Sequence, residues 1–372
     1  MTETAALAAI KGRSLWGDAW ARLTGNRAAV VGAVYLLLMI VACVVGPWLS
    51  PHGFSTIYRD YVRVPPSLEP YPRSGMIAQS LEAAASRARV ELGEWRLEDG
   101  RLIAHVRSSR PIDERITRYF DRTSAFENAA AEGKSPDGTE LTIRADIERH
   151  RFLFGTDNVG RDLFTRTLIA GRVSLSIGLL AGFVAVVIGV LYGATSGFLG
   201  GRIDEIMMRI VDILYSLPFI FFVIMLVVFF GRNFVLMFLA VGAVLWLDMA
   251  RIVRGQTLSL KRQEFVQAAD ALGVNQAGIL RRHIIPNTLG PVVVYMTLLV
   301  PQVIILESFL SFLGLGVQEP MSSWGVLISQ GAKNIGTANW LLIFPSFFLT
   351  TTLFALNFIG DGLRDALDPK DR

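Results

Sequence analysis

The sequence predicts an all-α integral membrane protein with six transmembrane helices and a small α+β extracytoplasmic insertion between the first two. Hydrophobic residues make up 52% of the 372-residue chain, charged residues make up 18%, and the mean hydropathy is +0.44. The apolar residues also gather in blocks of about 20, which is the length an α-helix needs to cross the hydrocarbon core of a bilayer. A soluble globular protein is therefore excluded.

Six apolar blocks give the predicted spans. They cover residues 28–49, 173–195, 210–230, 234–250, 289–313 and 340–360. The fourth block is the shortest, and it runs into Asp248 and Arg251. We interpret the first block as a retained span, because its apolar run is longer than that of a signal peptide and no small-x-small cleavage site follows it.

The domain order follows from these blocks. We expect the following segments along the chain: a cytoplasmic N-terminal tail (1–27), the first span (28–49), an extracytoplasmic insertion (50–152), a core with five spans (153–368) that includes a cytoplasmic loop (251–286), and a C-terminal tail (369–372).

Lys and Arg predict the orientation. With the N-terminus in the cytoplasm, the segments on that side hold most of the basic residues, and the short external loops hold only Arg232 and Lys333. Both termini are then cytoplasmic. The net charge of +4 reflects this topology, so it does not indicate a nucleic-acid partner. The single cysteine excludes an intrachain disulfide, and the four histidines show no metal-ligand spacing.

The insertion contains a readable β-hairpin. Asp99-Gly100 is typical of a two-residue turn, and the alternation around it places Leu97 opposite Leu102 and Trp95 opposite Ala104. A short helix is expected after Pro111, with apolar side chains at Ile112, Ile116, Tyr119 and Phe120. Residues 130–138 are small and polar, which favours a loop.

Small residues and prolines shape the spans. The second span carries one stripe of glycines, which indicates close packing of helices rather than a substrate groove: Gly178, Gly182, Gly189, Gly193 and Gly197. In the third span Pro218 removes a backbone donor, so we expect a kink there.

Two segments have part of the spacing of a phosphate-binding loop. Arg161 and Asp162 replace the Lys and Ser/Thr that would follow Gly160, and Asn128 replaces the first glycine of the segment that ends in Gly133-Lys134-Ser135. We therefore expect no ATPase site and no cofactor in this chain. Asp157 is expected to cap a short surface helix that begins near Arg161 and carries Leu163, Phe164 and Leu168.

The cytoplasmic loop 251–286 is the most informative segment. Glu264 to Leu272 predicts a short helix with apolar Phe265, Val266, Ala269 and Leu272, ended by Gly273 in the left-handed conformation. Asn275 predicts the N-cap of a second helix, Val274 packs on Ile279, and Pro286 marks the turn into the fifth span. Periodicity alone equally fits two amphipathic helices lying on the bilayer surface.

A family resemblance separates these readings. Gln267-Ala-Ala-Asp-Ala-Leu-Gly273, followed after nine residues by His283-Ile-Ile-Pro286, resembles the EAA loop of permease subunits of ATP-binding-cassette importers. Gln267 stands where the family usually has Glu, and Ile285 where it usually has Leu. The resemblance implies a coupling helix that docks on an ATPase subunit, with these coupling residues: Glu264, Gln267, Ala268, Ala269, Asp270, Gly273 and Pro286.

Other segments resemble one branch of that family. Phe154 to Arg166 and Gly171 to Gly178 are similar to the C-type subunit of the dipeptide, oligopeptide and nickel permeases, as is the segment from Ser311 to Gly325. The resemblance covers residues 12–50 and 152–368, and the insertion is longer than the corresponding loop in most such subunits. It implies the type I importer fold in a bacterial inner membrane. It also implies four kinds of partner: a homologous permease, two ATPases that hold ATP and Mg, an extracytoplasmic solute-binding protein and membrane lipid.

Three acids lie within or beside apolar blocks. Asp248 is expected to pair with Arg251, and Asp212 with Arg209, near the cytoplasmic ends of their helices. Glu307 lies deeper and has no evident local partner, so it is a candidate for the substrate pathway together with Pro218, or it faces the partner subunit.

The predicted function is that of a pore-forming subunit, not an enzyme, which moves oligopeptides or dipeptides inward by alternating access. Nickel or a peptide antibiotic remains an alternative cargo. A membrane-anchored sensor of an extracytoplasmic ligand is a different-class alternative, although it would not need five further spans. A membrane enzyme would need a reactive cluster, and the sequence shows none.

Overall fold

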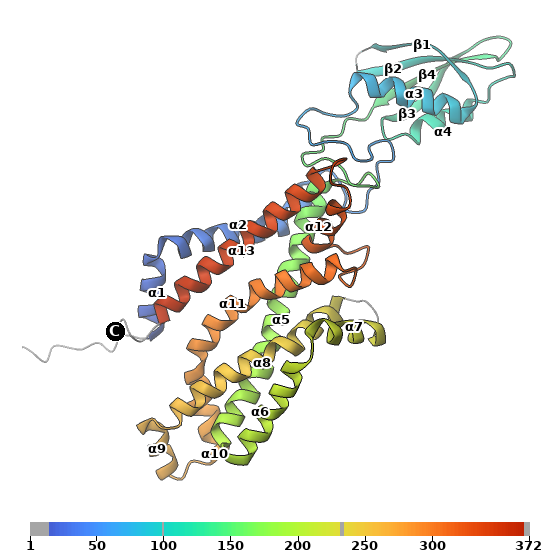
Figure 1. Cartoon of the computed structure of the whole chain (residues 1–372). Coiled ribbons are helices and arrows are strands. Elements are labelled where there is room, and N and C mark those ends of the chain that lie inside the picture. Colours follow the sequence, from blue (N-terminus) through green and yellow to red (C-terminus); the bar gives the residue numbers. More distant parts are fainter. Residues whose placement is uncertain (1–14, 99, 231–233, 368–372) are drawn as a thin grey trace, which may run out of the picture. The chain divides into compact units, whose positions relative to one another are not determined.

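The computed structural model describes residues 15–98, 100–230 and 234–367, and the chain divides into two compact units. The first unit gathers the described residues up to Val45, then Ile169–Ser329, then the described residues from Pro345 on. The second unit is formed by Gly46–Leu168 and Gln330–Phe344. Figure 1 gives the labels of the elements that are used below.

The helices outside the insertion include several long apolar ones joined by shorter ones. They are α1 (Leu15–Gly25), α2 (Arg27–Leu49), α5 (Leu163–Leu199), α6 (Gly201–Ser216), α7 (Phe219–Phe230), α8 (Phe234–Leu260), α9 (Glu264–Ala271), α10 (Gln276–Ile279), α11 (Ile285–Phe312), α12 (Trp324–Ala332) and α13 (Trp340–Leu367). A π-helical segment, Leu280–Ile284, joins α10 to α11.

Four helices of the described chain are long and apolar enough to cross a membrane. They are Arg27–Leu49, Leu163–Leu199, Gln276–Phe312 and Trp340–Leu367, and the third runs through α10, the π-helical segment and α11. The predicted turn at Pro286 is therefore wrong: Pro286 lies in the first turn of α11, where a proline needs no backbone donor. The predicted kink at Pro218 is a full break, because α6 ends at Ser216 and α7 begins at Phe219.

Helix α5 differs from its prediction at its beginning. The short surface helix expected near Arg161 is the first part of α5, which starts at Leu163 and continues without interruption to Leu199. Its N-cap is Asp162 rather than Asp157, since Asp162 Oδ2 accepts a hydrogen bond from the Thr165 amide at 2.8 Å. Apolar periodicity locates a helix, but the capping geometry decides where it begins.

Glycines hold α5 against two neighbours within the first unit. A Cβ added at Gly178 would lie 2.9 Å from Ile304 Cγ1 of α11. At Gly197 it would lie 2.8 Å from the Arg254 carbonyl oxygen of α8. These distances are shorter than a real Cβ tolerates, so the predicted glycine stripe is confirmed as a close-packing surface. Val173, Ile177 and Leu299 belong to the buried cluster formed there.

The insertion contains a four-stranded antiparallel sheet with the strand order β1-β2-β4-β3 (Figure 1). Its elements are α3 (Ser74–Ala88), β1 (Glu91–Glu98), β2 (Arg101–Arg107), a 3₁₀ turn (Glu114–Ile116), α4 (Thr117–Asp121), β3 (Phe126–Lys134) and β4 (Glu140–Ile147). Leu97 pairs with Leu102 and Trp95 with Ala104, so the predicted register is confirmed; Asp99 of the turn lies outside the described residues. The expected loop at 130–138 is wrong, because β3 includes its first five residues.

The sheet and its helices enclose a core of their own. Leu102, Ile143 and Phe120 are fully buried, and Leu81 of α3 joins them. The chain enters and leaves this part of the insertion at adjacent points, because Tyr71 and His150 exchange backbone hydrogen bonds of 2.7 and 2.9 Å.

Candidate functional site

The segment from α9 to α10 has a buried inner face. Val266 and Ala269 of α9 pack with Ile279, Ile284 and Phe198, the last of which lies at the end of α5. Val274 packs against the same cluster, in agreement with the predicted contact with Ile279. Ala269 was expected to contact an ATPase subunit. It is buried inside the segment instead, so another protein cannot reach it there.

The outer face of α9 is apolar and exposed. Phe265 is 42% exposed and Leu272 is 84% exposed, and Ala268 lies exposed between them at helical spacing. We call these three residues the outer stripe. The predicted apolar face thus divides in two: Val266 and Ala269 belong to the buried cluster, whereas the outer stripe lies outside it, with the Phe265 ring 6.4 Å from that of His283. An exposed apolar stripe of this kind is typical of an interaction site.

Local signals set the ends of the two short helices. Gly273 has a φ of +78° and follows Leu272, the C-cap of α9, so the predicted left-handed glycine at the end of this helix is confirmed. Asn275 caps α10, and its side-chain oxygen accepts a hydrogen bond from the Gly278 amide at 2.7 Å. Polar groups beside α9 also have partners. Gln267 Nε2 donates to the Arg262 carbonyl at 3.2 Å.

The α9–α10 segment is tied to α5 and α8. Lys261 Nζ donates to the Phe198 carbonyl at 2.6 Å, next to the buried face of α9. About two helical turns before Lys261, Arg254 of α8 makes a bidentate ion pair with Asp204 of α6, with N–O distances of 2.6 and 2.5 Å. Ser196 of α5 donates to the same carboxyl at 2.5 Å. Movement of α9 would therefore reach three long helices.

The predicted ion pairs of the apolar blocks are rearranged in the structure. Arg251 Nη2 lies 2.8 Å from Asp212 Oδ1, so the expected pairs Asp248 with Arg251 and Asp212 with Arg209 are replaced by a pair between α6 and α8. The sequence showed the charges, but only the packing of two helices brings these two side chains together.

Glu307 is fully buried and lies among serines. Its Oε1 accepts hydrogen bonds from Ser311 at 2.7 Å and from Ser323 at 2.6 Å, and Ser174 of α5 is a further polar neighbour. The expectation that Glu307 has no local partner is wrong, since Ser311 is one turn away on the same helix. Ser323 precedes α12 directly, so the carboxyl fastens the start of α12 to α11. Pro218, the other candidate for the substrate pathway, is exposed.

The segment from Phe154 to Arg166, which carried part of the family resemblance, forms a compact turn in the second unit. Asp157 Oδ1 accepts hydrogen bonds from the amides of Val159 and Arg161 at 2.9 Å each, and its Oδ2 lies 2.7 Å from Arg161 Nε. Gly155 and Gly160 have φ values of +76° and +87°. These contacts make Asp157 the centre of a turn that fixes the beginning of α5.

Comparisons with known proteins agree with this arrangement. Residues 185–372 match the family described as "Binding-protein-dependent transport system inner membrane component", which is half of the chain. Residues 14–66 match the "N-terminal TM domain of oligopeptide transport permease C". The chain belongs to the binding-protein-dependent transport permease family. Glu307 and the α9–α10 segment both lie within residues 185–372, the part of this permease that matches the first description.

The relatives of this permease include oligopeptide and dipeptide transport permeases. The oligopeptide transport system permease protein OppC of Haemophilus influenzae is 43% identical over 363 residues, which are 98% of this chain and 91% of that protein. OppC of Escherichia coli K12 is 59% identical over 236 residues (63% and 78%). The dipeptide transport system permease protein DppC of Bacillus subtilis is 37% identical over 356 residues (95% and 86%).

The cavity lined by His52 and Asp162 was not predicted from the sequence. Asp162 appeared there only as a residue unsuited to bind phosphate, and no signal joined it to His52, 110 positions away.

Four of the residues expected to take part in coupling do lie together, because Glu264, Gln267, Ala268 and Asp270 are all exposed on α9.

Proposed function

We propose that this chain is the C-type permease subunit of an ATP-driven importer that moves oligopeptides or dipeptides across the bacterial inner membrane. The named relatives in three bacteria are oligopeptide and dipeptide permeases, which supports this cargo. The observation that carries the proposal is the outer stripe of α9, an exposed apolar surface on a helix whose other face is tightly packed.

The proposed topology has six crossings and cytoplasmic termini, as in the type I importer fold. The four long apolar helices provide four crossings. Helix α6 with α7, and then α8, would provide the remaining two. The Lys/Arg bias of the short loops supports this orientation, in which α9 and α10 would lie in the cytoplasm.

The proposed partners are a homologous permease, two cytoplasmic ATPases and an extracytoplasmic solute-binding protein. ATP and Mg would bind the ATPases, and this chain would hold no cofactor and perform no covalent chemistry. The outer stripe would fit an apolar cleft on one ATPase, flanked by the exposed side chains of Glu264, Gln267 and Asp270.

Coupling would follow from the packing beneath α9. When the ATPases close, they would displace α9, and the buried cluster with Phe198 would carry this displacement to the end of α5. The Asp204–Arg254 pair would make α6 and α8 move with it. Two discrete arrangements of such packed helices are what alternating access requires.

A cross-linking experiment tests the docking of α9. Ala268→Cys should form a cross-link to the ATPase subunit with a short bifunctional reagent, whereas Arg202→Cys, exposed at the start of α6, should form little. The native Cys43 is buried and gives a low background. If Ala268→Cys reacts with lipid-borne probes alone, the α9 segment lies on the bilayer and the importer proposal fails.

The cargo is tested by reconstitution. ATPase activity of the assembled importer should rise when the solute-binding protein delivers oligopeptides or dipeptides. Stimulation by nickel or by a peptide antibiotic alone would replace the peptide assignment. A chain that forms no complex with an ATPase would instead favour the sensor alternative.

The roles of Glu307 and Pro218 in the substrate pathway stay proposals. The serine contacts of Glu307 favour a structural role in fastening α12, and a direct contact with cargo would need this cluster to open. Uptake by Glu307→Gln distinguishes the two: a change in cargo preference indicates contact, whereas a uniform loss of assembled protein indicates fastening.

A further inference from the structure

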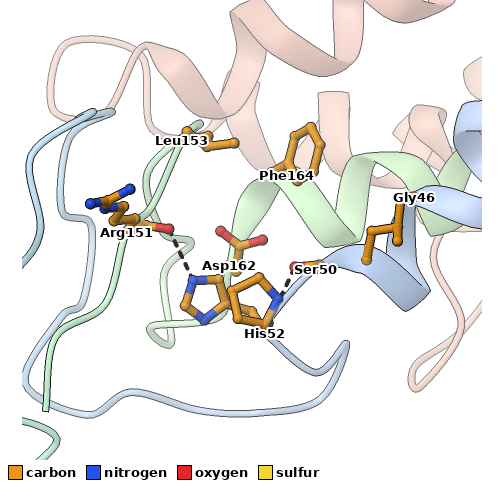
Figure 2. A pocket seen from close by; sticks show the side chains of 9 residues that line it. Gly46, Ser50, His52, Arg151, Leu153, Asp162 and Phe164 are labelled. Carbon is orange, nitrogen blue, oxygen red and sulfur yellow. Dashed lines mark hydrogen bonds between the residues drawn. The ribbon is translucent and has the colours of Figure 1, made fainter.

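A cavity of about 210 Å³ lies in the second unit, beside the last turn of α2 and the first turn of α5 (Figure 2). Its apolar lining includes Leu49, Leu153 and Phe164, and its polar lining includes Ser50, His52 and Asp162. This volume exceeds that of a single water, about 30 Å³ in the liquid, several times. The cavity therefore has room for a small organic group.

Most polar groups of the lining already have partners. The Arg151 carbonyl can only accept, so His52 Nε2 donates to it at 2.9 Å, and in the neutral ring Nδ1 then accepts from the Tyr58 hydroxyl at 2.8 Å. Ser50 Oγ is hydrogen-bonded to Thr165 Oγ1 at 2.7 Å. Neither side chain needs a ligand.

Asp162 is different, because one of its oxygens is unpaired. The residue is 1% exposed, Oδ2 caps α5 through the Thr165 amide, and Oδ1 makes no hydrogen bond to any residue that the structure describes. Figure 2 shows the carboxyl in the midst of the lining, between the rings of His52 and Phe164. Burial raises the pKa of Asp162 although the Thr165 amide stabilises the charged form, and a cation bound beside the carboxyl would oppose this rise.

The chemistry of the lining selects the kind of cation. A divalent metal ion needs a shell of several oxygen ligands, and the cavity offers one free carboxylate oxygen. A primary ammonium needs few acceptors and tolerates water for the rest, while its carbon stem packs against leucine and aromatic side chains. The site is thus suited to an aminoalkyl group.

The position of the cavity indicates the source of that group. Trp48 and Leu49 end the first candidate span, and they are 78% and 79% exposed. Exposed apolar and aromatic side chains at the end of a span lie at the level of lipid headgroups. We propose that this cavity binds the primary ammonium of an ethanolamine lipid headgroup, with Asp162 as its counter-ion.

The proposal is tested with the full-length chain in detergent, by native mass spectrometry with phosphatidylethanolamine or phosphatidylcholine added. Both lipids carry a positive nitrogen, but the quaternary nitrogen of choline has no N–H to donate. The wild-type chain should retain phosphatidylethanolamine about tenfold more strongly than phosphatidylcholine, as expected for one charged hydrogen bond. Equal retention of the two lipids would overturn the proposal.

Two variants locate the site. Asp162→Asn keeps an oxygen for the Thr165 amide and removes the charge, so it should abolish the preference while α5 stays capped. Leu153→Trp should abolish it by filling the cavity without any change of charge. Glu98→Gln makes the same charge change on an exposed strand residue and should leave the preference intact. A preference unchanged in both cavity variants would refute the assignment.

Free ethanolammonium distinguishes a lipid from a soluble amine. If it displaces bound phosphatidylethanolamine from the wild-type chain, the shared ammonium chemistry is supported. If ethanolammonium binds in an Asp162-dependent way while phosphatidylethanolamine shows no preference, the ligand is a soluble amine and the lipid assignment is wrong.

Discussion

Gly273 is the residue at which backbone conformation alone separates α9 from α10. Its φ of +78° disfavours any residue with a Cβ, yet an added Cβ would meet nothing within 4 Å. Substitution there changes the turn without any side-chain clash. A substitution at Gly273 therefore tests the backbone turn between α9 and α10 separately from the side-chain packing of this segment.

We expect Gly273→Val to lose transport while the protein still inserts into the membrane. The left-handed conformation costs a residue with a Cβ about 1–2 kcal/mol, so the turn should shift and displace the outer stripe. Gly273→Asn is the matched control, because Asn tolerates this conformation. The measurement is peptide uptake at equal amounts of membrane protein, and normal uptake by the Val variant would contradict the coupling role.

Asp204 gives a prediction about stability. Its carboxyl accepts hydrogen bonds from Arg254 and Ser196. Asp204→Asn should reduce the free energy of unfolding by about 2 kcal/mol, because it removes the charge that pairs with Arg254. Thermal unfolding in detergent measures the loss, and Glu205→Gln, an exposed neighbour, should show no such effect.

At the level of elements, the two faces of α9 predict opposite outcomes. Phe265→Ser and Leu272→Ser change exposed side chains, so Tm should hardly move, while cargo-stimulated ATPase activity should fall about tenfold. Val266→Ser places a hydroxyl in the buried cluster and should lower Tm instead. Parallel losses of stability in all three variants would show that the outer stripe is part of the folded core.

The contact of α5 with α8 provides a second test at this scale. A Cβ added at Gly193 would overlap the Ala250 carbonyl oxygen, whereas at Gly182 it would lie 3.4 Å from Val300 Cγ2. Gly193→Ala should therefore cost about 1–3 kcal/mol, and Gly182→Ala should cost little. Thermal unfolding in detergent measures both, and equal Tm values would mean that the two helices separate easily.

The same elements show what the sequence could predict. Gly273 and Asn275 act through their own backbone and near neighbours, so their roles followed from residue type and spacing. The division of α9 into two faces did not, because Phe265 and Val266 are both apolar and only the packing of α9 against Phe198 and the residues after α9 decides which of them is covered. The pair of Arg251 with Asp212 likewise depends on two helices meeting, which no local pattern reveals.

Span ends were harder to predict than span centres for a related reason. Hydropathy reports where a helix suits lipid, not where the helix stops. α5 begins ten residues before its apolar block, directly after its cap at Asp162, and α8 continues past its block to Leu260. Ser311 and Ser323 escaped notice as partners of Glu307 because serines are common packing residues in membrane helices.

At the scale of the whole molecule, the insertion has the properties of an autonomous folding unit. We expect a fragment of residues 70–151 to fold alone, since its sheet and helices enclose their own core and its ends are hydrogen-bonded to each other. The measurement is a cooperative thermal transition by circular dichroism. Leu102→Ala should lower the midpoint, whereas Leu97→Ala, on the exposed strand β1, should change it little.

The Tyr71–His150 bridge also bears on how such permeases diversify. Where a segment leaves and rejoins the chain at one point, its length can change freely, because the two bridged backbone positions keep their spacing whatever lies between them. A single recombination event between genes of this family could then exchange the inserted module without disturbing the long apolar helices. Descendants with the same transport machinery would in that way acquire different accessory domains.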